Sequence, residues 1–306
     1  MESEGRLLSL ALDLQYIGEE PVRASNWYGR AIQKYFIDAL IDVGLSDLVD
    51  ETHHQNDKRP YTASSLVGLT KSDKGVLFPG KSVWLRLTAL SDEILNALNL
   101  AVQPGALMGI GTEITLDRHP FLLYGLTAEQ PRGRFSSYKE IWERNYSSQL
   151  IDDCAISIEL LSPTYFKIKD LQYAYPLNLS VNRDDLVCHL PLPGLFLQSL
   201  VAKWNTFAPP PYRIQPDLVS EVYSEVYPSR VELKSQSVWL SFGGEPAHHI
   251  GIKGIISYNT GRKTHPMIKQ TLSLLLEYAR FAGVGWDTTF GFGQCSEAFC
   301  ERSGGC

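Results

Sequence analysis

The chain has 306 residues and a mass of 34.3 kDa, enough for one large domain or for two domains of about 150 residues, each with its own core. Its 28 Lys and Arg against 34 Asp and Glu give a net charge of -6, which argues against a general nucleic-acid binder, so any RNA site must be a local patch. No apolar stretch approaches the roughly 20 residues of a membrane helix. Glu2 and Glu4 stand where a signal peptide carries basic residues, so we expect a cytoplasmic protein that contacts no membrane.

The cysteines indicate neither a disulfide framework nor a zinc knuckle. They are odd in number and contain no Cys-x-x-Cys pair. The five are Cys154, Cys188, Cys295, Cys300 and Cys306. We expect free thiols and no bound metal.

Hydrophobic periodicity in the first part of the chain predicts the order β-α-β-β-α-β. The leucines between Leu8 and Leu14 alternate with other residues, which is typical of a strand with one buried face. Ser25 or Asn26 can cap an amphipathic helix that Gly44 ends. The remaining elements are strands over 61–69, 83–90 and 108–116, and a helix from Ser91 or Asp92 through Leu98.

The same order recurs after a connector that contains a short helix over 138–146. The expected strands cover 155–161, 218–227, 231–242, 250–258 and 292–299, and the expected helices cover 195–207 and 268–279, with Thr264 as the cap of the second. The predicted fold class is therefore α+β, with two tandem ferredoxin-like domains, 1–126 and 151–306, joined by a connector over 127–150. This fold hosts many functions, so function must be argued from sites.

The most specific segment is a glycine-rich run, FAGVGWDTTFGFGQ, over 281–294. Its glycines are Gly283, Gly285, Gly291 and Gly293. Such a loop can adopt positive φ and bring backbone N–H groups against a phosphate, and Thr288 and Thr289 add hydroxyl donors. The alternative is a helix C-cap followed by a bulge that leads into a strand.

This run resembles the loop A-G-(I/V)-G-x-x-T-x-x-G-F-G that closes the second ferredoxin-like domain in the RAMP superfamily, and in particular in its pre-crRNA processing endoribonucleases. Three further segments resemble the same family. They are IELLSPTYF over 158–166, the Leu-Pro-x-Pro run and helix over 190–207, and HHQNDKRPYTASSL over 53–66. The resemblance covers nearly all of the chain.

The resemblance implies RNA cleavage without a metal or cofactor. A ribose 2′-hydroxyl attacks the adjacent phosphate, which leaves a 2′,3′-cyclic phosphate and a 5′-hydroxyl. Histidine suits the proton transfers, since its pKa of about 6.5 allows both protonation states at neutral pH. Counting back from Pro-Tyr-Thr favours His53 over His54. Lys58 and Arg59 would supply positive charge at the phosphate, and Tyr28 would orient the 2′-hydroxyl.

The histidines also allow interpretations other than catalysis. A metal site at His53, His54 and Asp57 is disfavoured, because adjacent histidines do not share a helix face and no third strong ligand is near in sequence. A merely solvated polar loop is the other alternative. His248 and His249 are interpreted as ordinary strand histidines whose side chains point to opposite faces.

Local basic clusters would have to carry RNA binding. One lies in a span from 260 to 276 that has no acidic residue and includes Arg262, Lys263, His265 and Lys269. Arg132, Arg134, Lys139 and Arg144 form a second cluster that is diluted by Glu140 and Glu143. Charge runs are often only solvated faces.

The expected function is a metal-independent endoribonuclease that binds and cuts CRISPR repeat RNA. Its partners would be that RNA, the crRNA product and other proteins of a CRISPR effector complex, and it would be a monomer or a homodimer. The alternatives are a non-catalytic RAMP subunit that binds or caps crRNA, and a ferredoxin-like protein unrelated to RNA.

Overall fold

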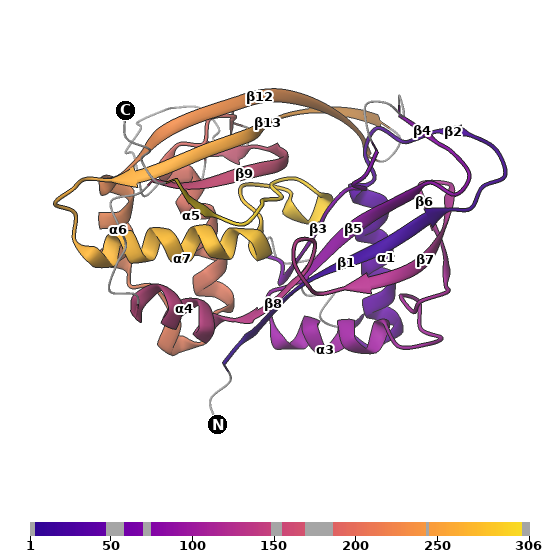
Figure 1. Cartoon of the computed structure of the whole chain (residues 1–306), viewed down its shortest axis with the longest axis horizontal. Helices are drawn as coiled ribbons and strands as arrows, with labels where there is room; N and C mark the ends of the chain where they lie inside the picture. Colours follow the sequence, from indigo (N-terminus) through magenta and orange to yellow (C-terminus); the bar gives the residue numbers. More distant parts are fainter. Residues whose placement is uncertain are drawn as a thin grey trace.

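Two antiparallel sheets, one from each half of the chain, lie side by side along the long axis of the molecule (Figure 1). The structure, a computed structural model, describes residues 4–46, 58–69, 75–147, 155–168, 186–242 and 245–301. Within these ranges no helix is long and apolar enough to cross a membrane.

The first sheet has the strand order β3-β5-β1-β7-β6, and β8 also pairs with β1. In chain order β3, β5, β1 and β7 are the second, third, first and fourth strands of a ferredoxin-like unit. The strands are β1 (Arg6–Tyr16), β3 (Tyr61–Ala63), β5 (Ser82–Ala89), β6 (Glu113–Leu116), β7 (His119–Thr127) and β8 (Arg134–Ser137); β2 (Val22–Arg23) pairs separately with β4 (Val76–Leu77).

Helices α1 (Gly29–Asp42) and α3 (Asp92–Ala101) complete this unit. Ile32, Phe36 and Leu40 recur on one face of α1, and that face is buried in the core of the first half. The Ser91 side chain accepts a hydrogen bond from the backbone of Ile94, so Ser91 caps α3 as its sequence predicts.

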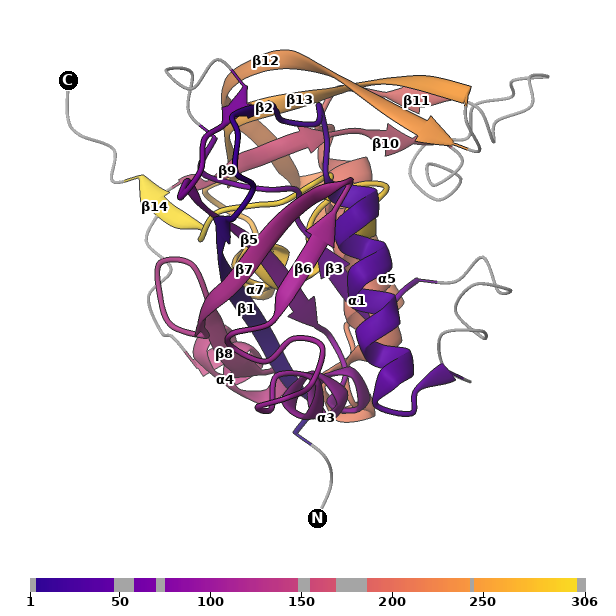
Figure 2. The same ribbon diagram turned by 90° about the vertical axis from the view of Figure 1, so that its right-hand side faces the viewer.

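The second sheet repeats the same strand order, β12-β13-β9-β14. Its elements are β9 (Ala155–Thr164), β10 (Phe166–Lys167), β11 (Val187–Cys188), α5 (Pro193–Phe207), η4 (Pro210–Tyr212), α6 (Pro216–Glu225), β12 (Val226–Phe242), β13 (Glu245–Thr260), α7 (Pro266–Ala282), η5 (Thr288–Phe290) and β14 (Phe299–Glu301). Strands β12 and β13 form a long hairpin that extends from the end of α6 toward the first half (Figures 1 and 2). The prediction of an α+β chain with two tandem ferredoxin-like units is confirmed.

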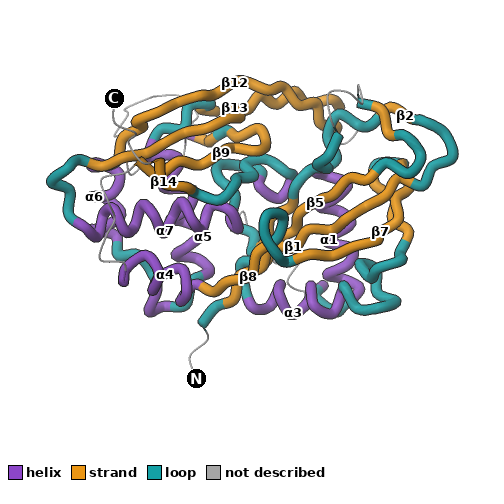
Figure 3. The backbone as a smooth tube through the Cα atoms, in the orientation of Figure 1, coloured by secondary structure: helices purple, strands orange, loops and turns teal. Residues whose placement is uncertain are grey.

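The connector places β8 and α4 (Tyr138–Ser147) between the two units. Figure 3 shows α3 and α4 on the side of the molecule opposite β12. Tyr138 packs edge-on against Trp204 of α5 and hydrogen-bonds to Tyr278 of α7, so the connector is buried against the second core. The domain boundaries at 126 and 151 stay a prediction.

One expected strand is wrong, because residues 218–227 lie mainly in helix α6. Leu218, Val219, Val222 and Tyr223 follow helical spacing, and Val222 and its neighbours pack on the second core. Pro216 at the first position of α6 fixes a helical φ. The cap of α7 also differs, since His265 and not Thr264 is the N-cap and accepts from the backbone of Met267.

Three other expected strands are shorter than predicted. In 61–69 only Tyr61–Ala63 forms a strand. In 108–116 only Glu113–Leu116 is extended, and a turn at Asp117 and Arg118 leads to β7, which the sequence pattern missed. Both turn residues have positive φ, the geometry of a tight hairpin turn, without the glycine that usually signals it. In 292–299 a loop precedes β14.

Candidate nucleic-acid interface

The glycine-rich loop lies where the two halves meet (Figure 1). The indole Nε1 of Trp27 donates to the backbone oxygen of Phe290 at 2.6 Å, and Ser64 forms a parallel bridge with Gly291. Any Cβ on Gly29, at the start of α1, would lie 1.7 Å from the Phe290 oxygen. The first half therefore packs directly against the loop backbone.

The shape of this loop depends on its glycines, all four of which have positive φ. Gly283 is the C-cap of α7, as the alternative interpretation predicts. At Gly293 an added Cβ would lie 1.9 Å from the Val284 oxygen, so the two limbs of the loop approach more closely than any other residue type allows.

The two threonine hydroxyls of the loop face protein groups. Thr288 accepts a hydrogen bond from Lys203 Nζ at 2.9 Å, and Thr289 accepts from Gln33 Nε2 and Arg59 NH1, both at 3.1 Å. Only 6% of Thr288 and 7% of Thr289 is exposed. RNA contacts by this loop stay a prediction, and the structure shows its threonines bonded to the buried Lys203 and Gln33 and the half-buried Arg59.

Arg59 brings the predicted catalytic segment to the glycine-rich loop. Besides its bond to Thr289, its guanidinium lies 5.8 Å from the ring centroid of Phe290. Lys58 next to it is exposed. His53 and His54 lie outside the described residues, and so does Asp57 of the alternative metal site. Within the described ranges, no group of three or more His, Cys, Asp or Glu could hold a metal ion.

Tyr28 is buried at the N-cap of α1, and its hydroxyl is engaged. The hydroxyl lies 2.8 Å from His119 Nδ1 and accepts a hydrogen bond from the backbone of Ser25. Burial raises the pKa of Tyr28. Sequence reasoning missed His119, because 91 positions separate the two residues and no local pattern marks the pair.

The two strand histidines occupy separate environments on β13. His248 stacks on Trp239, and His249 lies 5.9 Å from the ring centroid of Tyr165. The Tyr165 hydroxyl donates to Asp287 in the glycine-rich loop. Burial raises the pKa of Asp287, while the bond from Tyr165 and then the charge of His249 oppose that rise.

The first basic cluster is remote from the glycine-rich loop. Arg262 and Lys263 are exposed in the turn before α7, and the loop begins at the other end of this helix. The 17 residues of α7 make it about 25 Å long. The two predicted RNA-binding regions are thus not brought together.

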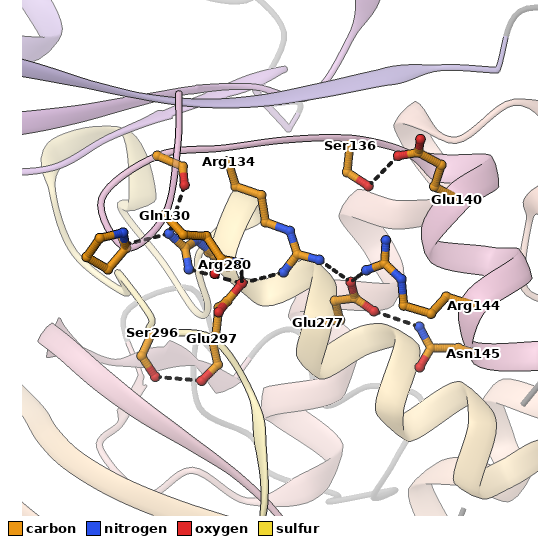
Figure 4. Close-up of polar contacts among 12 residues, drawn as sticks. Gln130, Arg134, Ser136, Glu140, Arg144, Asn145, Glu277, Arg280, Ser296 and Glu297 are labelled. Carbon is orange, nitrogen blue, oxygen red and sulfur yellow. Dashed lines mark hydrogen bonds and ion pairs between the residues drawn. The ribbon is translucent and has the colours of Figure 1, made fainter. Parts of the chain in front are cut away.

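The second basic cluster is largely neutralised by ion pairs, which Figure 4 shows in part. Arg134 contacts Glu277 at 2.7 Å and Glu297 at 2.5 Å, and Arg144 also pairs with Glu277. Arg132 pairs with Asp13, and Lys139 pairs with Glu4. The pairs of Arg134 and Arg144 join the connector to α7 and to the segment after the glycine-rich loop, and the other two pairs join it to β1 and to the residues before β1.

A cavity of about 440 Å³ opens between the two halves beside the loop. The first half contributes residues from the start of α1, from the segment after β3 and from β5, while the second contributes residues from β9, β12 and β13. Arg86 and Gln294 lie in its wall. Arg86 donates to the Gln294 side chain at 2.7 Å, and Gln294 donates to the Ala63 oxygen at 3.3 Å.

Residues 158–295, which include the glycine-rich loop, match the family CRISPR-associated endoribonuclease Cas6. This match confirms the resemblance to the pre-crRNA processing endoribonucleases of the RAMP superfamily. No curated protein matches the chain by sequence.

Solved structures share the fold over almost the whole chain. Cas6 (TTHA0078) in its product complex is 18% identical with a TM-score of 0.66, over 96% of this chain and 100% of that one. Thermus thermophilus Cas6 (TTHB231) is 18% identical with a TM-score of 0.62, over 96% and 99%. The product of a Cas6-related gene from Pyrococcus furiosus is 11% identical with a TM-score of 0.55, over 98% and 99%.

Proposed function

We propose that the chain is an endoribonuclease that binds CRISPR repeat RNA and cuts it without a metal ion. The observation that carries the proposal is the contact of Arg59 with Thr289, because it joins the end of the predicted catalytic segment to the glycine-rich loop of the other half. The family match over 158–295 and the product complex of the similar Cas6 (TTHA0078) support it.

In this proposal a histidine of the 53–59 segment removes the proton from the ribose 2′-hydroxyl. His53 is the first candidate and His54 the second. Lys58 and Arg59 stabilise the negative charge that develops on the phosphate, a role in which fixed cations are effective. Thr289 holds Arg59 in place before RNA binds. The products carry a 2′,3′-cyclic phosphate and a 5′-hydroxyl.

Tyr28 has a smaller role in the proposed cleavage than the histidine. Its hydroxyl can orient a ribose only by exchanging His119 for the RNA, since the two side chains are 2.8 Å apart. Removal of the Tyr28 hydroxyl is therefore expected to slow cleavage less than removal of the catalytic histidine. The glycine-rich loop and the second half hold the RNA backbone, and the product stays bound for transfer to an effector complex.

The test is incubation of the purified chain with its cognate repeat RNA in EDTA, with the product ends resolved. His53→Ala and His54→Ala are compared with wild type, and His248→Ala is the control, because His248 is an exposed strand histidine stacked on Trp239. Cleavage to a cyclic phosphate that one of the first two variants loses, with binding retained, supports the proposal. Tight binding without cleavage by wild type identifies a non-catalytic RNA-binding subunit instead.

A further inference from the structure

The cavity between the two halves contains a buried cation that contacts none of the carboxylates in the described part of the chain. Arg86 is only 4% exposed. Its side chain donates to Gln294 Oε1 at 3.1 and 2.7 Å and to the backbone oxygen of Cys295 at 3.2 Å, all uncharged acceptors. Among the described residues Arg86 has no ion pair with Asp or Glu. Burial, followed by the nearby charge of Arg280, lowers the pKa of Arg86 to about 10.

A buried charge without a counter-ion is costly, so natural proteins almost always pair it. The missing partner of Arg86 is expected to be an anion that comes from outside the chain. Arg280 gives the contrast within the same molecule, because it is equally buried but contacts Glu297 at 3.3 Å.

A second charged residue that lines the cavity also favours an anionic ligand. Lys253 of β13 also lines the cavity, and burial, followed by the charge of Lys234, lowers its pKa. The described residues of the wall include these two cations and neither Asp nor Glu. The cavity is therefore selective for a negatively charged group.

The volume of the cavity and its uncharged lining residues indicate which kind of anion fits it. A volume of about 440 Å³ fits one nucleotide, and small-ligand sites commonly lie between about 300 and 1,000 Å³. Trp27 and Trp84 give aromatic walls of the kind on which bases stack. Ser65, Ser162 and Gln236 add hydrogen-bonding groups from both halves.

We propose that this cavity binds one unpaired nucleotide of the RNA substrate, with its phosphate on Arg86 and Lys253 and its base among the indoles and the polar side chains. The cavity shares Tyr28 with the proposed cleavage site, but its two cations are separate from the 53–59 segment. The proposal rests on the proposed function in taking RNA as the ligand. Because Arg86 belongs to the first half and Lys253 to the second, a phosphate bound by both would also join the two halves.

The test uses repeat RNAs in which one phosphate at a time is replaced by an uncharged methylphosphonate. Equilibrium binding is measured in the variant that lacks both His53 and His54, and cleavage is measured separately with the native histidines. One replacement is expected to weaken binding about tenfold, and Arg86→Gln or Lys253→Gln is expected to abolish the effect of that replacement alone. Lys139→Gln, which removes one surface cation paired with Glu4, should leave the position dependence intact.

The outcomes separate this proposal from the proposed function. If RNA is cut but no single phosphate couples to Arg86 or Lys253, the cavity is not a phosphate site and the inference fails while the nuclease stands. If coupling is found without cleavage, the inference stands and the nuclease fails. An Arg86 that only ties the two halves together would weaken binding of every RNA equally. Lys253→Gln keeps the test decisive if Arg86→Gln does not fold.

Discussion

The Arg59 guanidinium donates to the Thr289 hydroxyl at 3.1 Å across 230 positions of sequence. Thr289 also accepts from Gln33 of α1, so one hydroxyl gathers a cation from the predicted catalytic segment and an amide from the first helix. The glycine-rich loop therefore positions the Arg59 side chain through a hydrogen bond. This role is separate from the RNA contacts predicted for the loop.

Replacement of Thr289 by Val is expected to slow RNA cleavage at saturating RNA by about two- to tenfold, the effect of one lost hydrogen bond of about 0.5–1.5 kcal/mol. The reason is that Arg59 loses its acceptor. Thr289→Ser keeps the hydroxyl and should retain near-wild-type rates. Single-turnover cleavage measures the change. Cleavage by Thr289→Val at the wild-type rate would show that the hydrogen bond from Arg59 to Thr289 does not matter for the reaction.

Gly29→Ala reverses the usual effect of a helix substitution. Ala in place of Gly in a helix ordinarily stabilises by about 0.5–1 kcal/mol. Here the new Cβ would lie 1.7 Å from the Phe290 oxygen, a backbone atom that can move only with the glycine-rich loop. The free energy of unfolding should fall by at least about 1–3 kcal/mol, as for overpacked cores, in urea denaturation.

Gly44→Ala is the control for that change. Gly44 has φ +92° and no atom within 4 Å of an added Cβ, so its substitution costs backbone strain without a clash. The loss of stability should be smaller for Gly44→Ala than for Gly29→Ala. Unfolding free energies in the opposite order would mean that the contact between α1 and the glycine-rich loop is loose in solution.

Sequence periodicity was sufficient for the fold where one face of an element is buried. The alternating leucines of β1 and the apolar face of α7 predict the ends of their elements to within about three residues. It failed at 218–227, where β-branched residues favour a strand but Pro216 and the spacing onto the core produce α6. It failed again at Asp117, since a hairpin turn of two residues with positive φ usually contains Gly or Asn.

The candidate site was predictable only in its local part. The glycine-rich loop is visible as a run, whereas its partners Trp27, Gln33 and Arg59 come from the other half of the chain. Arg86 lies within an apolar strand pattern and gives no sign of lining a cavity. Only tertiary packing shows that its acceptors are all uncharged.

Lys203 is expected to make the free energy of unfolding depend on pH. Its ammonium donates to the Ala282 oxygen at 2.7 Å and to Thr288, and burial lowers its pKa to about 7. The unfolded chain, with a lysine pKa near 10.5, then binds more protons than the folded chain above pH 7. The free energy of unfolding should therefore rise between pH 7 and 8.5, by at most about 1.4 kcal/mol per pH unit.

Urea denaturation at pH 6.5, 7.5 and 8.5 measures this rise, and Lys203→Met should remove it. The window stops at 8.5 because Cys295 has the opposite effect at higher pH, where burial raises its thiol pKa to about 12 and the unfolded thiol ionises first. An identical pH dependence in wild type and Lys203→Met would place the proton uptake elsewhere. A change in absolute stability alone would be uninformative, since Met leaves the Ala282 oxygen without its donor.

The two basic clusters should respond differently to charge removal. Arg134 lies between Glu277 and Glu297 and its side chain is 16% exposed. Arg134→Gln is expected to lower stability by about 1–3 kcal/mol, because each carboxylate loses one charged hydrogen bond and keeps an ion pair with Arg144 or Arg280. Arg262 and Lys263 are exposed, so their joint replacement by Gln should leave stability within about 0.5 kcal/mol.

If Arg262 and Lys263 contact RNA phosphates, the slope of log affinity against log salt should fall by about 0.7 to 0.9 for each residue replaced. Affinity measured between 50 and 200 mM salt, beside urea denaturation of the same variants, separates the effects. An unchanged salt slope in the Arg262 and Lys263 variant would show that the turn before α7 contacts no RNA phosphate, and the proposed RNA contacts would then be those at the interface between the two halves.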